Sequence, residues 1–301
     1  MVVYMLEKKS LKGWLYLLPA LLFLGAFMVY PIIDVFIYSF EENYSFVSQQ
    51  YTGIGIYNYV FILSDIEFIL AVRNTFLMVI ITVPLSTTIA LLIAVGLNAI
   101  KPLRKLFQTI FFLPYVTNTL AVGMVFLIIF DKNDRSIGLY NSILQLIGIH
   151  PVDYIDGPYW AKMFVLCFYI IWNVMPFKIL VLVGALQSVK KEYYQAAKVD
   201  GASKIRMFRK ITVPMISPMI SYLVITGFIG AFKEYSNAIA LFGTNLTEAG
   251  MNTIVGYIYN TLYAQTGGYP SYASAAAIVL FAIVLTITGI NLLVSKKYVY
   301  Y

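Results

Sequence analysis

The chain has 301 residues, of which 60% are hydrophobic and only 12% are charged, and its mean hydropathy is +0.81. Ordinary globular domains carry about 25% charged residues, so this chain cannot cover a water-facing surface with polar groups. The composition therefore excludes a soluble globular protein and favours a protein that uses lipid as its solvent.

Six apolar stretches are long enough to cross about 30 Å of hydrocarbon, which takes roughly 20 helical residues. Strands of outer-membrane barrels would alternate apolar and polar residues over about ten positions, which these continuous runs do not do. The sequence therefore predicts an all-α polytopic membrane protein with six transmembrane helices. In chain order we expect them at Trp14–Ile33, Phe76–Leu97, Gln108–Phe130, Ala161–Leu186, Ile216–Phe242 and Ser274–Val294.

Lysine and arginine are distributed unevenly among the connections. Fifteen of the 21 fall at the N-terminus, in the connections after the second and fourth stretches and at the C-terminus, whereas four fall in the remaining connections with most of the acids. Cytoplasmic loops carry the excess of Lys and Arg. Both termini are therefore expected in the cytoplasm. The net charge of +7 follows from this topology and gives no reason to expect a nucleic-acid partner.

The expected organisation is a single membrane domain with short tails. Residues 1–13 form a cytoplasmic N-terminal tail, 14–294 the six-helix transmembrane domain and 295–301 a cytoplasmic C-terminal tail. The first stretch follows Lys12 closely and has no small-residue cleavage site behind it, so we expect a retained anchor.

Motifs for catalysis and for cofactors are missing from the sequence. One histidine, His150, and one cysteine, Cys167, cannot build a His/Cys metal cluster. There is no GxxxxGK[ST] to hold ATP phosphates and no GxSxG or HExxH. We therefore expect a protein that is not an enzyme and that holds no cofactor of its own.

The segment EYYQAAKVDGASKIRMFRKITVP, residues 192–214, is unusually polar for this chain. Glu192–Val199 can form a short helix with an acid near its N-terminus, where the helix dipole favours it. Gly201 falls where a helix end needs left-handed backbone angles. A second helix would follow, with Ile205, Phe208 and Ile211 on one face. The pattern predicts a helix–turn–helix that is exposed in the cytoplasm and suited to a soluble partner.

AAKVDGA followed by FRKITVP resembles the EAA loop of the permeases of ABC importers, in the carbohydrate-uptake version. The likeness extends along the chain to LLPALLFLGAFMVYP, RNTF, FFLPYV, GALQSV, TIVGYIYNTLY and YASAAAIVLF, and it is similar to the maltose-permease type that forms the first permease of a heterodimer. It implies the type I importer permease fold in the plasma or inner membrane of a prokaryote, with an EAA-type coupling loop over 188–214. The partners it implies are a second permease, two ATPase subunits that carry ATP and Mg, and an extracytoplasmic sugar-binding protein. Carried over by motif, the coupling positions are Glu192, Gln195, Ala196, Ala197, Asp200 and Gly201.

One residue departs from the family's motif. Gln195 stands where the family has the glutamate of EAA, so a salt bridge from this position to an ATPase arginine is in doubt. Glu192 lies three residues earlier on the same side of the predicted helix, and we take it as the candidate replacement.

Polar groups within spans are expensive and mark cavities or partners. Thr226, Gly230, Lys233 and Asn237 are spaced to form a single stripe on a continuous fifth helix. The resemblance places sugar contacts on the fourth and fifth helices, and a sugar would stack on rings while amides and hydroxyls bind its hydroxyl groups. The alternative is that Asn173 and Thr226 only join helices, at about 0.6 kcal/mol per bond. The role of Lys178 stays open. The candidate substrate-path residues are Trp172, Asn173, Phe177, Thr226, Gly230, Lys233 and Glu234.

The sequence thus predicts the membrane permease of an ATP-driven importer of a carbohydrate, with an oligosaccharide favoured. One alternative is a permease for another solute such as glycerol phosphate, which would need cations at Lys178 or Lys233. A second is an ion-coupled secondary transporter, which would usually show internal repeats and broken helices around an ion site.

Overall fold

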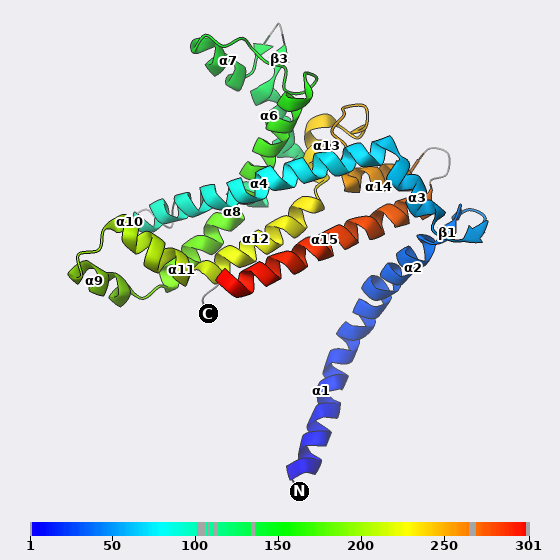
Figure 1. Cartoon of the computed structure of the whole chain (residues 1–301), viewed down its shortest axis with the longest axis horizontal. Coiled ribbons are helices and arrows are strands. Elements are labelled where there is room, and N and C mark those ends of the chain that lie inside the picture. The colour runs from blue at the N-terminus through cyan, green and yellow to red at the C-terminus, as the bar shows by residue number, and fades with distance from the viewer. Residues whose placement is uncertain are drawn as a thin grey trace. The chain divides into compact units, whose positions relative to one another are not determined.

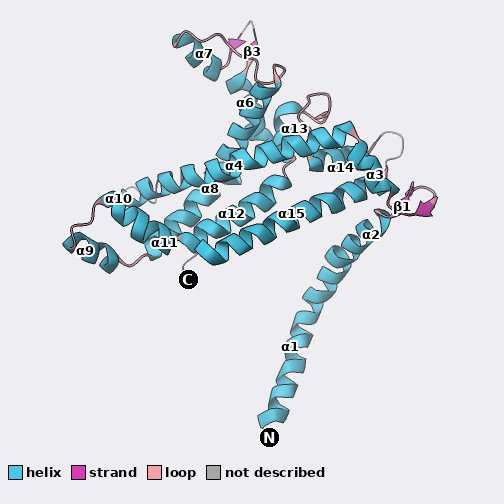
Figure 2. Cartoon of the chain, viewed as in Figure 1, coloured by secondary structure: helices cyan, strands magenta, loops and turns pink. Residues whose placement is uncertain are grey.

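The structure is a computed structural model that describes residues 2–100, 106, 109–110, 113–133, 136–264 and 269–298. The described chain is helical almost throughout (Figures 1 and 2), so the mostly helical class predicted from sequence is confirmed. Short strands occur in two places. β1 (Glu41–Glu42) pairs antiparallel with β2 (Gly53–Ile54), and β3 (Lys132–Asn133) pairs antiparallel with β4 (Ser136–Ile137).

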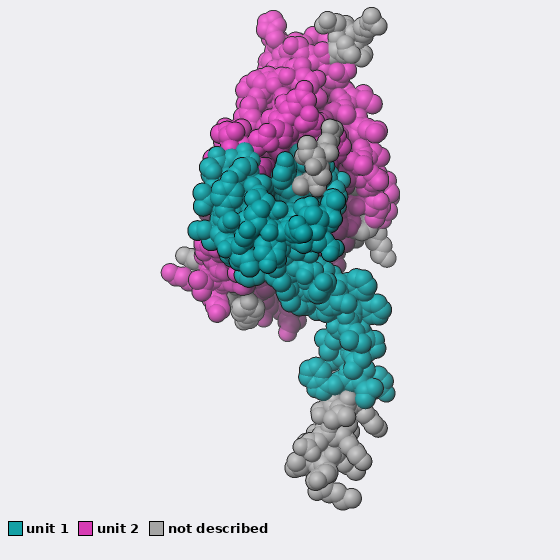
Figure 3. Space-filling view, turned by 90° about the vertical axis from the view of Figure 1, so that its right-hand side faces the viewer, with its two compact units in different colours: residues 1–65, 258–279 teal, residues 66–257, 280–301 magenta. Residues whose placement is uncertain are grey.

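The chain divides into two compact units, which Figure 3 distinguishes by colour: residues 1–65 with 258–279, and residues 66–257 with 280–301. The first unit holds α1 (Val2–Leu24), the π-helical segment η1 (Gly25–Val29), α2 (Tyr30–Tyr38) and α3 (Tyr57–Ser64). The candidate span Gly13–Tyr38 has none of its apolar window buried within the chain. A helix that is apolar on every side needs lipid or another subunit around it.

Two π-helical segments precede prolines. η1 ends two residues before Pro31, and η3 (Phe208–Thr212) ends two residues before Pro214. Proline has no N–H to donate and its ring clashes with the carbonyl four residues earlier, so the helix is disturbed at that turn. In each case the next N–H bonds five residues back instead: Tyr30 N–H to Gly25 O, and Val213 N–H to Phe208 O.

The second unit is built on three long helices that pack side by side. α4 (Ile66–Ala99) packs along α8 (Tyr159–Ser188) and α12 (Ser217–Phe232). With 34 residues, α4 is about 51 Å long, which exceeds the hydrocarbon thickness. The remaining elements are η2 (Leu113–Val116), α6 (Thr119–Phe130), α7 (Leu139–Leu146), α9 (Lys191–Val199), α10 (Lys204–Met207), α11 (Val213–Met215) and α13 (Ser236–Phe242), with α14 (Ile254–Leu262) and α15 (Pro270–Tyr298) continuing from one unit into the other.

An apolar cluster joins α4, α8 and α12 where the three helices approach the polar segment. Ala90 and Ala94 of α4 face Leu182 and Val183 of α8, and all four are fully buried. Small residues on one helix let the neighbouring backbone come close, which is how membrane helices gain contact without a hydrophobic driving force. Tyr194 of α9 packs against the same cluster.

Four of the six predicted spans coincide with long apolar helices. Among the described residues these are Gly13–Tyr38, Ile66–Ala99, Tyr159–Ser188 and Pro270–Lys297, and a fifth arises if the pair Lys204–Met215 and Ser217–Phe232, bent by 65°, is one span. Each helix extends beyond the predicted bounds, and α4 does so most, beginning at Ile66 and not at Phe76.

The third predicted span, Gln108–Phe130, is wrong as a single helix. Residues 107–108 and 111–112 lie outside the described chain, and the helix that is described, α6, begins only at Thr119. Asn118 is its N-cap: the side-chain Oδ1 accepts the N–H groups of Leu120 at 2.9 Å and Ala121 at 3.3 Å. The first N–H groups of a helix have no carbonyl partner within the helix, and the Asn118 side chain supplies one here. The helix therefore starts at this residue.

The fifth predicted span, Ile216–Phe242, is also wrong as a single helix. α12 ends at Phe232 and α13 begins at Ser236, so the chain breaks at Lys233–Tyr235. The stripe that assumed a continuous helix therefore fails beyond Gly230. The break is fixed by Glu234, whose Oε1 accepts the backbone N–H groups of Tyr235 and Asn237 and so starts a new helix.

Candidate functional site

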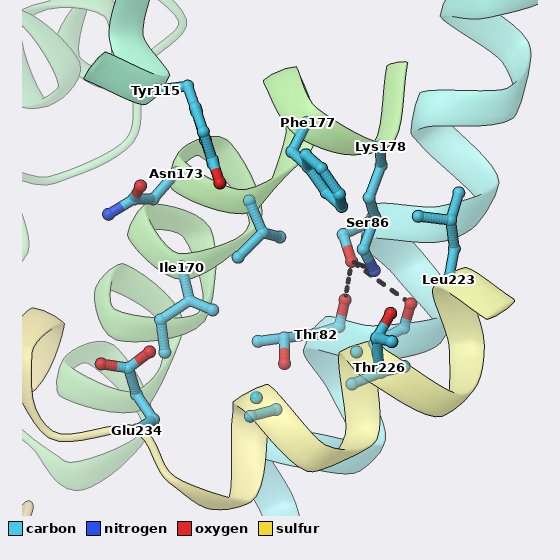
Figure 4. A pocket seen from close by; sticks show the side chains of 15 residues that line it. Thr82, Ser86, Tyr115, Ile170, Asn173, Phe177, Lys178, Leu223, Thr226 and Glu234 are labelled. Carbon is cyan, nitrogen blue, oxygen red and sulfur yellow. Dashed lines mark hydrogen bonds between the residues drawn. The ribbon is translucent and has the colours of Figure 1, made fainter. Parts of the chain in front are cut away.

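A cavity of about 320 Å³ lies between α4, α8 and α12 (Figure 4). Its wall is mainly apolar, with a few hydroxyl, amide and charged groups, which is the usual composition of a small-molecule site. The residues that line it are Thr82, Val83, Ser86, Tyr115, Ile170, Asn173, Val174, Phe177, Lys178, Leu223, Thr226, Gly227, Gly230, Ala231 and Glu234.

One end of the cavity is formed by Lys178, which is only 4% exposed. Its Nζ donates to Ser86 Oγ at 2.7 Å and to Thr87 Oγ1 at 2.8 Å, so a cation on α8 is bound to two hydroxyls on α4. Those hydroxyls donate in turn to the carbonyl oxygens of Thr82 and Val83. Every member of this network is therefore oriented.

The other end of the cavity is formed by Glu234, which lies opposite Lys178 in Figure 4. Its Oε2 accepts from Asn237 Nδ2 at 2.8 Å, in addition to the backbone N–H groups that its Oε1 accepts. Asn237 Oδ1 accepts from Asn173 Nδ2 at 2.8 Å. The relay Glu234–Asn237–Asn173 ties the start of α13 to α8 and fixes the orientation of the Asn173 amide at the cavity wall.

Aromatic and hydroxyl groups complete the wall between the two ends. The rings of Phe177 and Tyr115 stack with centroids 5.7 Å apart. Thr226 Oγ1 donates to the carbonyl of Tyr222 at 2.7 Å, which leaves its lone pairs for a ligand. The cavity thus offers ring faces, an amide and hydroxyls, together with one base and one acid.

Five of the seven predicted substrate-path residues line this cavity and two do not. Trp172 packs edge to face on Phe126 at 5.4 Å instead, and Lys233 is exposed at the break after α12. The five that line it are Asn173, Phe177, Thr226, Gly230 and Glu234.

Sequence reasoning missed the contribution of α4. Thr82, Ser86 and Lys178 meet only in the folded chain, since Lys178 is 92 positions from Ser86. A signal was present, because Thr82, Ser86 and Thr87 are hydroxyl residues at helical spacing within an otherwise apolar run. The hydroxyls of such residues often bond only to carbonyls of their own helix. The spacing alone therefore does not show whether these hydroxyls line a cavity.

Two residues of the RNTF stretch, in the first half of α4, form hydrogen bonds to the segment that precedes α14. Asn74 Nδ2 donates to the carbonyls of Gly250 and Asn252, and its Oδ1 accepts from Tyr159 Oη at 2.8 Å. Thr75 Oγ1 accepts the N–H of Ile254 at 3.0 Å. These buried bonds fix the segment before α14 to α4 and α8, and sequence reasoning had assigned them no role.

The polar segment forms the helix–turn–helix that its sequence predicts. Gly201 has φ +71° and ends α9. Ala202 N–H donates to Ala197 O and Gly201 N–H donates to Lys198 O, which is the Schellman pattern. Ser203 Oγ then accepts the N–H of Arg206 and caps α10. The turn is thus set by its own local bonds.

This segment has no buried side chain in α9 or α10. Val199 is 88% exposed and Ile205 is 68% exposed. A groove of about 230 Å³ lies between the two helices, lined by Ala197, Asp200, Ala202, Arg206, Met207, Lys210 and Ile211. The surface is shaped and apolar in part, yet nothing within the described chain covers it.

The structure brings the predicted coupling residues together on this segment. Glu192, Gln195 and Ala196 are exposed on α9, and Asp200 and Gly201 form its end. Tyr194, on the same helix, shares a hydrogen bond with Thr212 at 2.9 Å and packs on the apolar cluster of α4, α8 and α12. The exposed segment therefore contacts the apolar cluster of the helices that line the cavity.

No metal site is evident among the described residues, where no group of three or more His, Cys, Asp and Glu side chains could hold an ion. Cys167 is buried within α8.

A family model matches residues 86–299, which contain most of the cavity wall and all of the polar segment. Its description is binding-protein-dependent transport system inner membrane component. The chain therefore belongs to this family of inner membrane components of binding-protein-dependent transport systems.

Individual relatives are similar over nearly the whole chain. The arabinooligosaccharides transport system permease protein AraP of Bacillus subtilis (strain 168) is 31% identical over 293 residues, which cover 96% of this chain and 90% of AraP. The lactose transport system permease protein LacF of Rhizobium radiobacter is 31% identical over 289 residues, covering 94% and 93%.

A solved structure has the same fold. It is the crystal structure of a bacterial ABC transporter involved in the import of the acidic polysaccharide alginate, with a TM-score of 0.81, 25% identity and 99% coverage of both chains. The predicted resemblance to permeases of sugar importers is confirmed.

Proposed function

We propose that the chain is the membrane permease subunit of an ATP-driven importer of an oligosaccharide, and that it forms a heterodimer with a second, similar permease. The observation that carries the proposal is that the cavity and the exposed segment are in contact through packed side chains. A cavity lined by rings, an amide and hydroxyls is joined through a packed cluster and Tyr194 to an exposed helix–turn–helix. The sugar names of the relatives AraP and LacF support the choice of substrate class.

The cavity chemistry suits a carbohydrate. Phe177 and Tyr115 present ring faces to the apolar side of a sugar ring, while Asn173 and Thr226 bind hydroxyl groups. Apolar walls with a few oriented polar groups are typical of sites that hold one class of small molecule in a fixed pose. The relay through Asn237 orients the Asn173 amide before a sugar arrives.

The exposed segment couples ATP hydrolysis to transport. Its uncovered apolar residues and the groove between α9 and α10 provide the surface for a soluble ATPase subunit. When two such ATPases close on ATP, they pull on Ala196–Gly201, and the movement reaches α4, α8 and α12 through Tyr194 and the apolar cluster. The cavity is then opened alternately to each side of the membrane. ATP and Mg belong to the partner subunits, and we propose no cofactor in this chain.

We further propose that the chain spans the membrane six times with both termini in the cytoplasm. The third span would combine α6 with the residues before it, and the fifth would combine α12 with α13 across the break. A transmembrane domain over 14–294 would then lie between tails at 1–13 and 295–301. An extracytoplasmic sugar-binding protein delivers the substrate, in keeping with the family's description as binding-protein-dependent.

The proposal is tested by reconstituting this chain with its second permease, two ATPases and binding protein in proteoliposomes. Uptake of radiolabelled arabinotriose, lactose and glycerol phosphate is measured with ATP inside, and without ATP under a sodium or proton gradient. We expect ATP-dependent uptake of at least one sugar. Uptake that needs only the ion gradient would overturn the proposal in favour of a secondary transporter.

Glycerol phosphate is the second candidate, and the cavity gives it less support. A phosphate dianion is usually bound by several cations or backbone N–H groups. Among the described residues that line the cavity, Lys178 is the only cation, and Glu234 adds a negative charge. ATP-driven uptake of glycerol phosphate in preference to both sugars would favour this candidate.

A further inference from the structure

Lys178 stands where α4, α8 and α12 meet, and its amine has more hydrogen-bonding capacity than the protein uses. An ammonium group has three N–H donors, and two of them reach Ser86 Oγ and Thr87 Oγ1. Gly227 of α12 lies close to the amine, because a Cβ at that position would lie 3.4 Å from Nζ and 3.2 Å from Val83 Cγ1. One donor on a buried cation is therefore left for the cavity that Lys178 lines.

The charge of this amine is not balanced within the described chain. No described carboxylate forms an ion pair with Lys178. The acid of the same cavity, Glu234, lies at the opposite end, and its oxygens are bonded to the N–H groups at the start of α13 (Figure 4). A buried charge that has only neutral hydroxyls as partners is unfavourable, so such a group needs a reason to be retained.

A purely structural role does not supply that reason. The hydroxyls of Ser86 and Thr87 already donate to carbonyls of their own helix, so neither needs a lysine to be satisfied. A neutral donor at position 178 would tie α8 to α4 without placing a charge in the membrane. Intramembrane ionisable residues that face a cavity usually mark the path of a substrate.

We propose that Lys178 binds a carboxylate of the transported sugar, so that the importer takes an oligosaccharide containing uronic acid. A carboxylate is a monoanion that one ammonium group neutralises, whereas a phosphate dianion would remain negative beside a single lysine. This inference rests on the proposed import of oligosaccharides and names the substrate class of that same cavity.

The test uses matched pairs of sugars that differ only at the carboxylate. Trimers of galacturonate, mannuronate and glucuronate are compared with their carboxyl-reduced, neutral counterparts. Binding to the complete transporter, with both permeases and both ATPases purified in detergent, is measured by calorimetry at low salt. The same complex is prepared with Lys178→Met, which keeps the length of the side chain, and with Lys233→Met, which removes the exposed lysine outside the cavity.

We expect the wild-type complex to bind at least one acidic trimer about 30-fold or more tightly than its neutral partner, as for a buried charge pair at the weak end of the measured range. Lys178→Met should abolish that preference, so that the acidic and neutral trimers bind with similar affinity, and Lys233→Met should retain it. A wild-type complex that prefers no acidic trimer overturns the inference, as does a preference that survives Lys178→Met.

A second variant and an uptake measurement complete the test. If Lys178→Met does not assemble, Lys178→Gln replaces it, and the wild-type comparison alone still overturns the inference when no acid is preferred. ATP-dependent uptake of the same sugars in proteoliposomes separates the two proposals. Uptake of neutral sugars without any acid preference rejects the carboxylate site and leaves the importer intact, whereas no ATP-dependent uptake of any sugar rejects the importer itself.

Discussion

The cavity wall and the exposed helix–turn–helix belong to the same unit but are built in opposite ways. At the cavity, Asn237 is buried and bonded on both sides, and Lys178 is held by two oriented hydroxyls. In α9 and α10 no side chain is buried, and the turn depends on local backbone bonds around Gly201. The cavity groups are oriented by bonds within the chain, whereas the exposed segment is shaped by its own backbone bonds and presents a surface that the described chain does not cover.

This difference shows how a permease can keep its binding site separate from the segment that binds the ATPase. Buried hydrogen-bonded networks are stable and hold a ligand in one pose, whereas exposed segments with few contacts are free to adapt to a partner. Changes at the cavity should therefore alter the stability of the chain itself. Changes at the exposed segment should alter function only when the ATPase is present.

The largest effect is expected from Glu234→Ala. The substitution removes the acceptor of the Asn237 backbone and side-chain N–H groups, and each buried donor left unpaired costs about 1–3 kcal/mol. We expect a clear fall in the thermal unfolding temperature of the purified complex in detergent, with loss of uptake. Glu234→Gln is the matched control, since it keeps one acceptor oxygen and should retain most of the stability. Equal stability of Glu234→Ala and wild type would show that the hydrogen bonds from Glu234 to Asn237 do not stabilise the cavity wall.

A smaller effect is expected from Gly201→Val. The left-handed φ of +71° suits glycine and is unfavourable for other residues by roughly 1–2 kcal/mol, most of all for β-branched ones. We expect sugar-stimulated ATP hydrolysis to fall several-fold in proteoliposomes while the unfolding temperature of the complex barely changes. Gly201→Asn, which tolerates this conformation, should restore most of the activity. If both variants lower the unfolding temperature as much as Glu234→Ala does, the contrast between the two regions is lost.

The smallest effect is expected from Tyr194→Phe. The substitution removes only the hydrogen bond to Thr212 and keeps the ring on the apolar cluster, so the loss should be about 0.5–1.5 kcal/mol. ATP hydrolysis should stay near the wild-type rate, with a modest fall in sugar transported per ATP hydrolysed. Tyr194→Ala, which also removes the packed ring, should lower that ratio much further. A ratio that is unchanged in both variants would indicate that Tyr194 does not connect the two regions.

Sequence reasoning recovered the parts of the molecule that are decided locally. The long helices α4, α8 and α15 follow from uninterrupted apolar runs, and the turn at Gly201 follows from residue types that cap helices. The break after α12 could not be predicted, because Lys233–Tyr235 are compatible with a helix and the interruption depends on where the Glu234 carboxylate binds. The burial of Lys178 was equally hidden, because its partners Ser86 and Thr87 come from a helix 91–92 positions away.

The most direct test of the division between the two regions is ATP hydrolysis stimulated by the loaded binding protein, measured in proteoliposomes for Ala196→Phe. Ala196 is exposed on α9, so the larger side chain should not disturb the chain's own packing. Ala99→Phe, at an exposed alanine on the last residue of α4, is the matched control. We predict that Ala196→Phe reduces hydrolysis to the unstimulated rate with the unfolding temperature unchanged, while Ala99→Phe behaves as wild type. Full stimulation of Ala196→Phe would contradict it.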